Sequence, residues 1–153
     1  MKIGVISDTH GFLDPRVEKI FAGVDHILHA GDIGHSIIEL ELKFIAPVTL
    51  VVGNNDPDLT FKETEVVTLE DKKFLIHHIV SPRSLTEKLE ARIRREKPDV
   101  VVFGHTHKAF CEMINGILFF NPGYAGKPKF GAERSVALFD LAGGSFRPKF
   151  ISL

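Results

Sequence analysis

The stretch Val100-Val101-Val102-Phe103-Gly104-His105-Thr106-His107 joins an apolar run to two closely spaced histidines. Its β-branched and aromatic residues are typical of a buried strand, and Gly104 permits a tight turn directly after it. The two imidazoles are separated by one residue, so both rings can turn towards the same region. Such a pair often binds a metal but also occurs on ordinary surfaces, so its meaning depends on what the other strand ends carry.

Three earlier apolar runs also end in polar residues of kinds that bind metals. Residues 2–7 lead into Asp8 and His10, residues 26–30 lead into Asp32, and residues 48–52 lead into Asn54. Helix signals separate the runs, namely the Asp-Pro pair at residues 14–15 and the Ser-x-x-Glu pattern at residues 36–39. Strands that alternate with short helices are typical of parallel sheets, whose carboxyl ends gather ligands at one edge.

The second part of the chain has the pattern of hairpins. A polar turn joins residues 66–69 to 74–77, Asn115-Gly116 joins 110–114 to 117–120, and Gly143-Gly144 joins 135–141 to 146–151. Asn-Gly is a strong hairpin signal. Between these segments, the Ser-x-x-Glu pattern at residues 84–87 predicts the start of another helix. We therefore expect an α/β fold with two sheets and helices outside them.

Composition limits the classes of protein that this chain can belong to. Its 153 residues, 44% of them hydrophobic, suit one well-buried core, so residues 1–153 are expected to form a single domain. A net charge of −1 offers no extended nucleic-acid surface. The single cysteine, Cys111, allows no intrachain disulfide and no cysteine zinc cluster.

The sequence also gives expectations about localisation and assembly. No run approaches the roughly 18 apolar residues of a membrane span, and the first residues form a strand pattern in place of a signal sequence, so we expect a cytoplasmic protein without membrane contact. The apolar strand residues near the C-terminus suit either a core or an edge-to-edge pairing of two copies, so a homo-oligomer is an open alternative.

Together the strand ends carry carboxylate, amide and imidazole groups. The seven candidate metal ligands are Asp8, His10, Asp32, Asn54, His77, His105 and His107. This set, which lacks thiolates, suits Mn²⁺, Fe, Ni²⁺ or Zn²⁺ better than a structural zinc site or a calcium cage. Seven ligands are too many for one ion unless a carboxylate is shared, so the set predicts a two-metal site.

The ordered motifs resemble those of the calcineurin-like metallophosphoesterase family. That family has Asp-x-His, Gly-Asp, Gly-Asn-His-Asp/Glu, a strand-end His usually followed by Gly, and Gly-His-x-His, and matches occur in this order across residues 8–107. Asn121-Pro122-Gly123 is similar to a segment of the family's small bacterial and archaeal phosphodiesterase subgroup. The resemblance implies a four-layer sandwich of two mixed β-sheets flanked by helices.

The resemblance also implies roles for individual residues. Carried over by position, it assigns Asp8, His10 and His107 to one metal, Asn54, His77 and His105 to the other, and a bridging position to Asp32. It implies two divalent ions, with Mn²⁺ favoured and Ni²⁺, Fe, Zn²⁺ or Mg²⁺ as alternatives, and a metal-bridging hydroxide that attacks the phosphorus of a small-molecule phosphodiester. Asp32, Asn54 and His105 would then be the catalytic residues.

Two positions depart from the family pattern. Asn55 stands where much of the family has a histidine, so an imidazole that could protonate the leaving oxygen is missing, and we expect phosphodiesters or good leaving groups to be favoured over unactivated monoesters. Asp56 is expected to orient this loop by hydrogen bonding. At His77-His78, register favours His77 as the ligand, because a one-residue slip turns a side chain to the opposite face; His78 is then placed near the leaving group.

Other interpretations remain open at this point. A noncatalytic interaction scaffold on the same fold, similar to the retromer subunit with this architecture, could lose histidines that this chain keeps. A nucleotide or dinucleoside polyphosphate hydrolase is a second alternative. Asn121 is expected to be structural, and Tyr124 is expected at the surface, with a contact to substrate or to a neighbouring subunit as the alternative.

Overall fold

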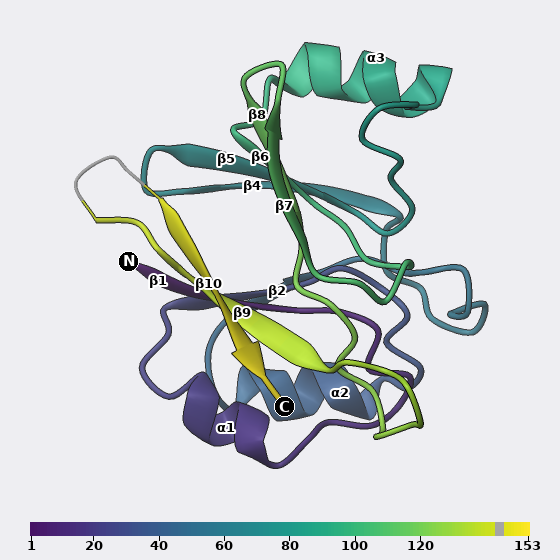
Figure 1. Ribbon diagram of the computed structural model, residues 1–153, viewed down its shortest axis with the longest axis vertical. Helices are drawn as coiled ribbons and strands as arrows, with labels where there is room; N and C mark the ends of the chain where they lie inside the picture. Colours follow the sequence, from purple (N-terminus) through teal and green to yellow (C-terminus); the bar gives the residue numbers. More distant parts are fainter. Residues whose placement is uncertain (143–145) are drawn as a thin grey trace.

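Two five-stranded mixed sheets form the centre of the fold (Figure 1). The structure is a computed structural model that describes residues 1–142 and 146–153. The first sheet has the order β10-β9-β1-β2-β3. Its strands are β1 (Lys2–Ile6), β2 (His26–His29), β3 (Val48–Leu50), β9 (Ser135–Asp140) and β10 (Arg147–Ser152). The predicted parallel order is confirmed for β1, β2 and β3, while β9 pairs antiparallel with β1 and β10 pairs antiparallel with β9.

The second sheet has the order β4-β5-β6-β8-β7. Its strands are β4 (Thr64–Leu69), β5 (Lys72–His77), β6 (Val100–Val102), β7 (Phe110–Ile114) and β8 (Ile117–Asn121). The three central strands run parallel, and β4 and β7 pair antiparallel at the edges. The hairpin predicted at Asn115-Gly116 is confirmed, with both residues at positive φ. The turn predicted at Gly143-Gly144 lies outside the described residues.

Helices cover the outer faces of the two sheets (Figure 1). α1 (Arg16–Ile20) and α2 (Ile37–Lys43) pack on the first sheet, and α3 (Glu87–Glu96) packs on the second. The predicted capping box at residues 84–87 is wrong in position, because Thr86 is the N-cap of α3 and its hydroxyl accepts the Leu89 N–H at 3.2 Å. The two sheets with helices on their outer faces confirm the four predicted layers.

Strand β6 is buried on both sides. Val100 and Val102 face the core between the two sheets, whereas Val101 faces the core beneath α3. A strand covered on both faces needs apolar side chains at every position, which explains the uninterrupted valine run. Among the described residues, no helix is long and apolar enough to span a membrane.

Candidate metal centre

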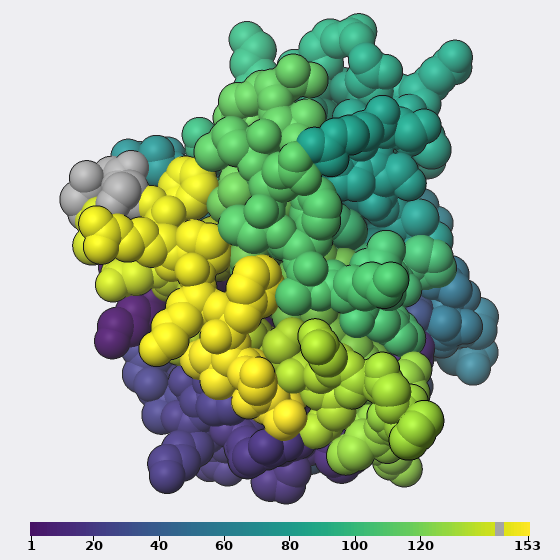
Figure 2. All heavy atoms as spheres, in the orientation of Figure 1, coloured from purple at the N-terminus to yellow at the C-terminus, as the bar shows by residue number. Residues whose placement is uncertain are grey.

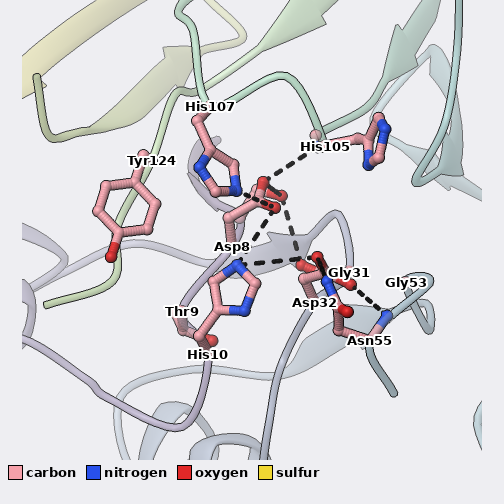
Figure 3. A network of polar contacts seen from close by, with 12 residues as sticks. Asp8, Thr9, His10, Gly31, Asp32, Gly53, Asn55, His105, His107 and Tyr124 are labelled. Carbon is pink, nitrogen blue, oxygen red and sulfur yellow. Dashed lines mark hydrogen bonds and ion pairs between the residues drawn. The ribbon is translucent and has the colours of Figure 1, made fainter. Parts of the chain in front are cut away.

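The ligand-type residues lie where strands of both sheets end. Asp8 and His10 follow β1, Asp32 follows β2, and His105 and His107 follow β6. These loops meet at the junction of the sheets, so residues nearly a hundred positions apart in the chain come into contact (Figure 3). The prediction that strand ends gather polar groups at one edge is confirmed for these residues.

Two buried carboxylates form the middle of the cluster. The side chains of Asp8 and Asp32 are 0% and 2% exposed. From Asp8 Oδ1, the Nε2 atoms of His107, His10 and His78 lie at 3.3, 3.8 and 3.9 Å. From Asp32 Oδ2, the Nε2 atoms of His78 and His10 lie at 3.4 and 3.7 Å. Each carboxylate therefore faces several imidazoles.

Two buried polar atoms in this cluster have no hydrogen-bond partner among the described residues. They are Asp8 Oδ1 and His78 Nε2. The other oxygen of Asp8 accepts the Ser7 hydroxyl at 2.7 Å and the His105 backbone N–H at 3.2 Å. An unsatisfied buried polar atom is costly, and a bound cation would satisfy both. The residues present thus fit a metal ion.

Two overlapping groups have the spacing that a metal site requires. In one group, ligand atoms of Asp8, His10 and His107 lie within 4.8 Å of one another, and in the other those of Asp8, Asp32 and His78 do. Asp8 is common to both, and Asp32 lies between His10 and His78. Two groups that share a carboxylate are the arrangement expected of a two-metal site.

His78, and not His77, lies in the cluster, so the preference for His77 is corrected. The His78 ring is buried, and its Nδ1 donates to the Ala30 carbonyl oxygen at 2.7 Å, which leaves the lone pair of Nε2 directed at the carboxylates. The His77 ring turns away and its Nδ1 lies 2.8 Å from Thr64 Oγ1. It borders a cavity of about 500 Å³ against α3.

The alternation along β5 explains this outcome. Phe74 and Ile76 face the core between the sheets, and Leu75 faces α3. His77 continues the α3 side, so His78 returns to the side of the core and of Asp8. The sequence shows that the side chains of β5 alternate between two apolar faces. It does not show which of these two faces borders the site.

Asn54 and His105 lie at the rim of the cluster. His105 Nδ1 lies 3.1 Å from Asn54 Oδ1, and the His105 ring packs edge-on to the His78 ring at 5.4 Å. Both side chains are exposed. The structure thus brings these two predicted ligands together beside His78, and the direct contact from this loop to Asp8 is made by the His105 backbone.

Asn55 holds Asp32 in place. Its backbone N–H donates to Asp32 Oδ1 at 2.9 Å, and its side-chain amide donates to Asp32 Oδ2 at 2.8 Å. One of the two hydrogens of the side-chain amide is therefore used by the carboxylate. In the place of a titratable imidazole, the chain has a group that positions Asp32.

The role expected of Asp56 is confirmed. Its carboxylate is buried and accepts the backbone N–H groups of Ile33, Gly34 and Gly53 at 3.0, 2.9 and 2.8 Å. It thus ties the loop after β3 to the loop after β2, which carries Asp32. A carboxylate that accepts several backbone N–H groups makes strong, charge-assisted bonds.

The surroundings shift the pKa values of the two central carboxylates in opposite directions. Burial raises the pKa of Asp8, although the Ser7 hydrogen bond and the nearby His78 act in the opposite direction. Burial alone would also raise the pKa of Asp32, but the two hydrogen bonds from Asn55 lower it below its ordinary value. A cation beside Asp8 would favour its ionised form.

Much of the backbone around the cluster has an unfavourable conformation. Five of its residues have φ values in the left-handed region: Asp8 (57°), His10 (47°), Asp32 (53°), His105 (71°) and His107 (60°). Non-glycine residues rarely adopt this region, and such strain concentrates at functional sites. Here it turns side chains from successive loops towards one point.

Gly104 is required by close packing. A Cβ atom at this position would lie 2.6 Å from Asp8 Oδ2 and would overlap Ser7 Oγ. The loop after β6 can therefore approach the loop after β1 only without a side chain here. The Asn121 amide, which donates to the Gly104 carbonyl oxygen at 3.0 Å and to Thr106 Oγ1 at 3.1 Å, has the structural role expected of it.

Tyr124 is part of the site, contrary to the expectation that it lies on the surface. It is 5% exposed, its ring stacks on His107 with centroids 4.8 Å apart, and the His10 ring lies 6.3 Å away (Figure 3). The segment after β8 folds back because the Ala125 N–H donates to the Ser7 carbonyl oxygen at 3.1 Å. Nothing near Tyr124 in the sequence signals this long-range contact.

The sequence also matches known proteins over most of its length. The sequence model of the calcineurin-like phosphoesterase superfamily domain matches residues 1–144. A probable metallophosphoesterase of Methanothermobacter thermautotrophicus is 36% identical, with 94% of this chain and 87% of that protein covered. A phosphodiesterase of Methanocaldococcus jannaschii is 30% identical, with 80% of this chain and 83% of that protein covered.

Solved structures show the same fold. A predicted phosphoesterase from Streptococcus pneumoniae, 25% identical, aligns with a TM-score of 0.77 over 99% of this chain and 88% of that one. A Vps29 single mutant from Entamoeba histolytica, 23% identical, also has a TM-score of 0.77, over 100% of this chain and 99% of that one. The second likeness concerns the fold alone. The motifs, the cluster and the match over residues 1–144 agree, and this chain belongs to the calcineurin-like phosphoesterase superfamily.

Proposed function

We propose that this protein is a phosphodiesterase that uses two divalent metal ions to hydrolyse a small-molecule phosphodiester. The observation that carries the proposal is the pair of ligand groups that share Asp8, with the lone pair of His78 Nε2 left without a partner among the described residues. Membership in a phosphoesterase family and the phosphodiesterase name of the M. jannaschii relative support the same reaction class.

The proposed ligands follow the geometry. Asp8, His10 and His107 would hold one ion, and His78 with the rim residues Asn54 and His105 would hold the other. We propose Asp32 as the bridging carboxylate, because its Oδ2 lies 3.7 Å from His10 Nε2 and 3.4 Å from His78 Nε2. Asp8 is common to both ligand groups, but its Oδ1 lies nearer to His107 Nε2, at 3.3 Å, than to His78 Nε2, at 3.9 Å, so we place it on the first ion. When bound, the ions would supply Lewis acidity and activate a water molecule as the nucleophile. Mn²⁺ is favoured for this mixed oxygen and nitrogen set, with Ni²⁺, Fe, Zn²⁺ and Mg²⁺ as alternatives.

The charge of the protein groups suits an anionic substrate. Asp8 and Asp32 contribute two negative charges, and the remaining proposed ligands are neutral, so two divalent ions leave the centre positive. In the reaction, a bond forms between the water oxygen and phosphorus while the bond to one ester oxygen breaks. Asp32, Asn54 and His105 would orient the groups around phosphorus, and the charge that develops in this step would meet a preorganised positive site.

Asn55 sets the expected preference among substrates. Its side chain is a carboxamide, which has no acidic proton to give to the departing oxygen, and its amide group donates a hydrogen bond to Asp32. Esters with good leaving groups, and diesters in preference to unactivated monoesters, should therefore react best. A nucleotide or dinucleoside polyphosphate hydrolase remains the alternative within the enzyme class.

A noncatalytic scaffold is the alternative outside the enzyme class, and the likeness to Vps29, which concerns the fold alone, does not decide between the two. The cluster weighs against the scaffold, because a scaffold gains nothing from strained loops and a buried, unsatisfied His78 Nε2. The cytoplasmic location and the homo-oligomer stay predictions.

The deciding experiment measures hydrolysis of bis-p-nitrophenyl phosphate and of p-nitrophenyl phosphate by metal-stripped protein, before and after addition of Mn²⁺, Ni²⁺, Mg²⁺ or Zn²⁺. We expect metal-restored activity that favours the diester and is lost in Asp32→Asn. Folded protein that binds metal but hydrolyses neither ester with any ion would overturn the proposal and favour the scaffold.

A further inference from the structure

Lys129 reaches the candidate metal centre from a loop that is distant in sequence. Its Nζ lies 3.4 Å from Nδ1 of His107 and 4.3 Å from the centre of the Tyr124 ring. It belongs to the exposed residues 127–131 of the segment between β8 and β9, which is coloured yellow-green in Figure 2. A positive charge thus stands beside a predicted metal ligand, and the family motifs did not point to it.

Both ends of this loop are fixed to the body of the protein. The Tyr124 hydroxyl donates to the Lys127 carbonyl oxygen at 2.8 Å. The buried Arg134 donates from Nε to the Gly126 carbonyl oxygen at 2.7 Å and from its terminal nitrogen to Asp14 at 2.9 Å. The Lys129 side chain itself is exposed. The backbone of the loop is therefore anchored near the centre, and the ammonium group lies beside His107 while it stays accessible to a ligand.

The contact with His107 does not satisfy the ammonium once a metal is bound. His107 directs Nε2 at Asp8, at 3.3 Å. A neutral imidazole that gives Nε2 to a metal carries its hydrogen on Nδ1, and that nitrogen can no longer accept a hydrogen bond from Lys129. The Tyr124 ring offers its π face, which attracts a cation but is no strong hydrogen-bond acceptor. An anionic oxygen from a ligand would complete the arrangement.

We propose that Lys129 binds a nonbridging oxygen of the substrate's phosphoryl group at the His107 side of the centre. The proposal deepens the proposed function and rests on it for the identity of the ligand as a phosphoryl group. Tyr124 and Asn55 lie on opposite sides of the two carboxylates in Figure 3, so Lys129 acts across the centre from the loop that lacks an imidazole. It contributes to capture of the anion and does not replace that imidazole.

The same loop also leaves room for an ester substituent. A cavity of about 510 Å³ opens beside His107 and is bordered by residues 131–133 and Lys108. Cavities of several hundred Å³ commonly accommodate small ligands. A phosphodiester anchored by Lys129 would have space there for one of its two organic groups.

The test compares three variants in the Mn²⁺-loaded protein. Lys129→Met removes the charge, Lys129→Arg keeps it, and Lys127→Met removes a second exposed lysine of the same loop as a matched control. Binding of inorganic phosphate is measured by titration calorimetry, and KM and kcat are measured separately for bis-p-nitrophenyl phosphate. Lys129→Met should weaken phosphate binding and raise KM by about tenfold, with a smaller change in kcat, because one charge-assisted hydrogen bond is lost.

Lys129→Arg should restore most of the binding, and Lys127→Met should match the unmodified protein. Mn²⁺ binding should be the same in all variants, because Lys129 is not proposed as a ligand. If Lys129→Met binds phosphate as tightly as the unmodified protein does, or if the unmodified protein binds no phosphate, the inference is wrong. If phosphate binding depends on Lys129 but no ester is hydrolysed by any form, the inference stands and the proposed phosphodiesterase function fails.

Discussion

The histidine pairs at the ends of β5 and β6 resemble each other in sequence but differ in their geometry. His77 and His78 are adjacent, so their side chains take opposite faces, and His78 alone of the two reaches the carboxylates. His105 and His107 are separated by one residue and both lie on the side of the centre, the first at its rim and the second against Asp8. Strand alternation separates the adjacent pair at the end of β5, whereas His105 and His107 lie in the loop after β6, where left-handed φ values of 71° and 60° turn them to the side of the centre.

The largest effect on activity is expected when His77 and His78 are replaced one at a time. His78→Ala should lower metal-dependent diesterase activity by at least about a hundredfold, because it removes a proposed ligand, and even groups that only orient ligands are worth about 10- to 100-fold. His77→Ala is the matched control and should keep most of the activity. Turnover of both variants and Mn²⁺ binding by calorimetry measure the difference. The reverse ranking would return His77 to the ligand set.

The close approach of the loop that carries His105 and His107 to Asp8 should depend on the absence of a side chain at Gly104. In Gly104→Ala, the new methyl group meets Asp8 and Ser7, so we expect a loss of about 1–3 kcal/mol in the free energy of unfolding and a large loss of activity. Gly116→Ala is the control, because a Cβ there has no neighbour within 4 Å among the described atoms, although its φ of +80° costs about 1 kcal/mol. Urea unfolding and turnover separate the two. Normal turnover in Gly104→Ala would contradict the close packing described above.

A histidine added at the end of β3 should change the substrate preference. Asn55→His supplies an imidazole near Asp32, and we expect the ratio of p-nitrophenyl phosphate to bis-p-nitrophenyl phosphate hydrolysis to rise about tenfold. Asn55→Ala removes the same hydrogen bond from the side-chain amide to Asp32 without adding an acid, so the comparison isolates the effect of the imidazole. Equal ratios in the two variants would show that the missing imidazole does not set the preference.

The smallest effect on activity is expected at His29, which supports the site without facing it. Its Nδ1 accepts the Gly31 N–H at 3.1 Å, its Nε2 lies 2.9 Å from Thr9 Oγ1, and complete burial lowers its pKa to about 3. The unfolded chain takes up this proton near pH 6.5. The stabilisation is therefore fully present above pH 6.5 and is lost as the pH falls from 6.5 towards 3.

This loss should amount to at most about 1.4 kcal/mol per pH unit. Urea unfolding of the unmodified protein and of His29→Gln across this range measures it. The variant should show a shallower dependence of unfolding free energy on pH. Parallel curves would mean that His29 has the same pKa in the folded and the unfolded protein, which would contradict the lowered pKa.

The strands and their polar ends were predictable because they rest on local signals. Continuous apolar runs, the Asn115-Gly116 turn and the polar residues after each run are properties of short segments, and Asp8, His10, Asp32 and His107 follow from them. Helix starts were less predictable. At α3, two neighbouring residues, Ser84 and Thr86, can both cap a helix, and packing of Leu89 and Ile93 on the second sheet accompanies the start at Glu87.

By itself, the sequence determined the fold class, the order of the motifs and the chemistry of the ligands. The tertiary structure decided that His78 enters the site, that Tyr124 stacks on His107, and that Lys129 stands beside it. The reason is physical. Alternation along a strand is written in the sequence, but which face borders a site depends on how two sheets pack, and a contact between loops that are far apart in the chain leaves no local signal.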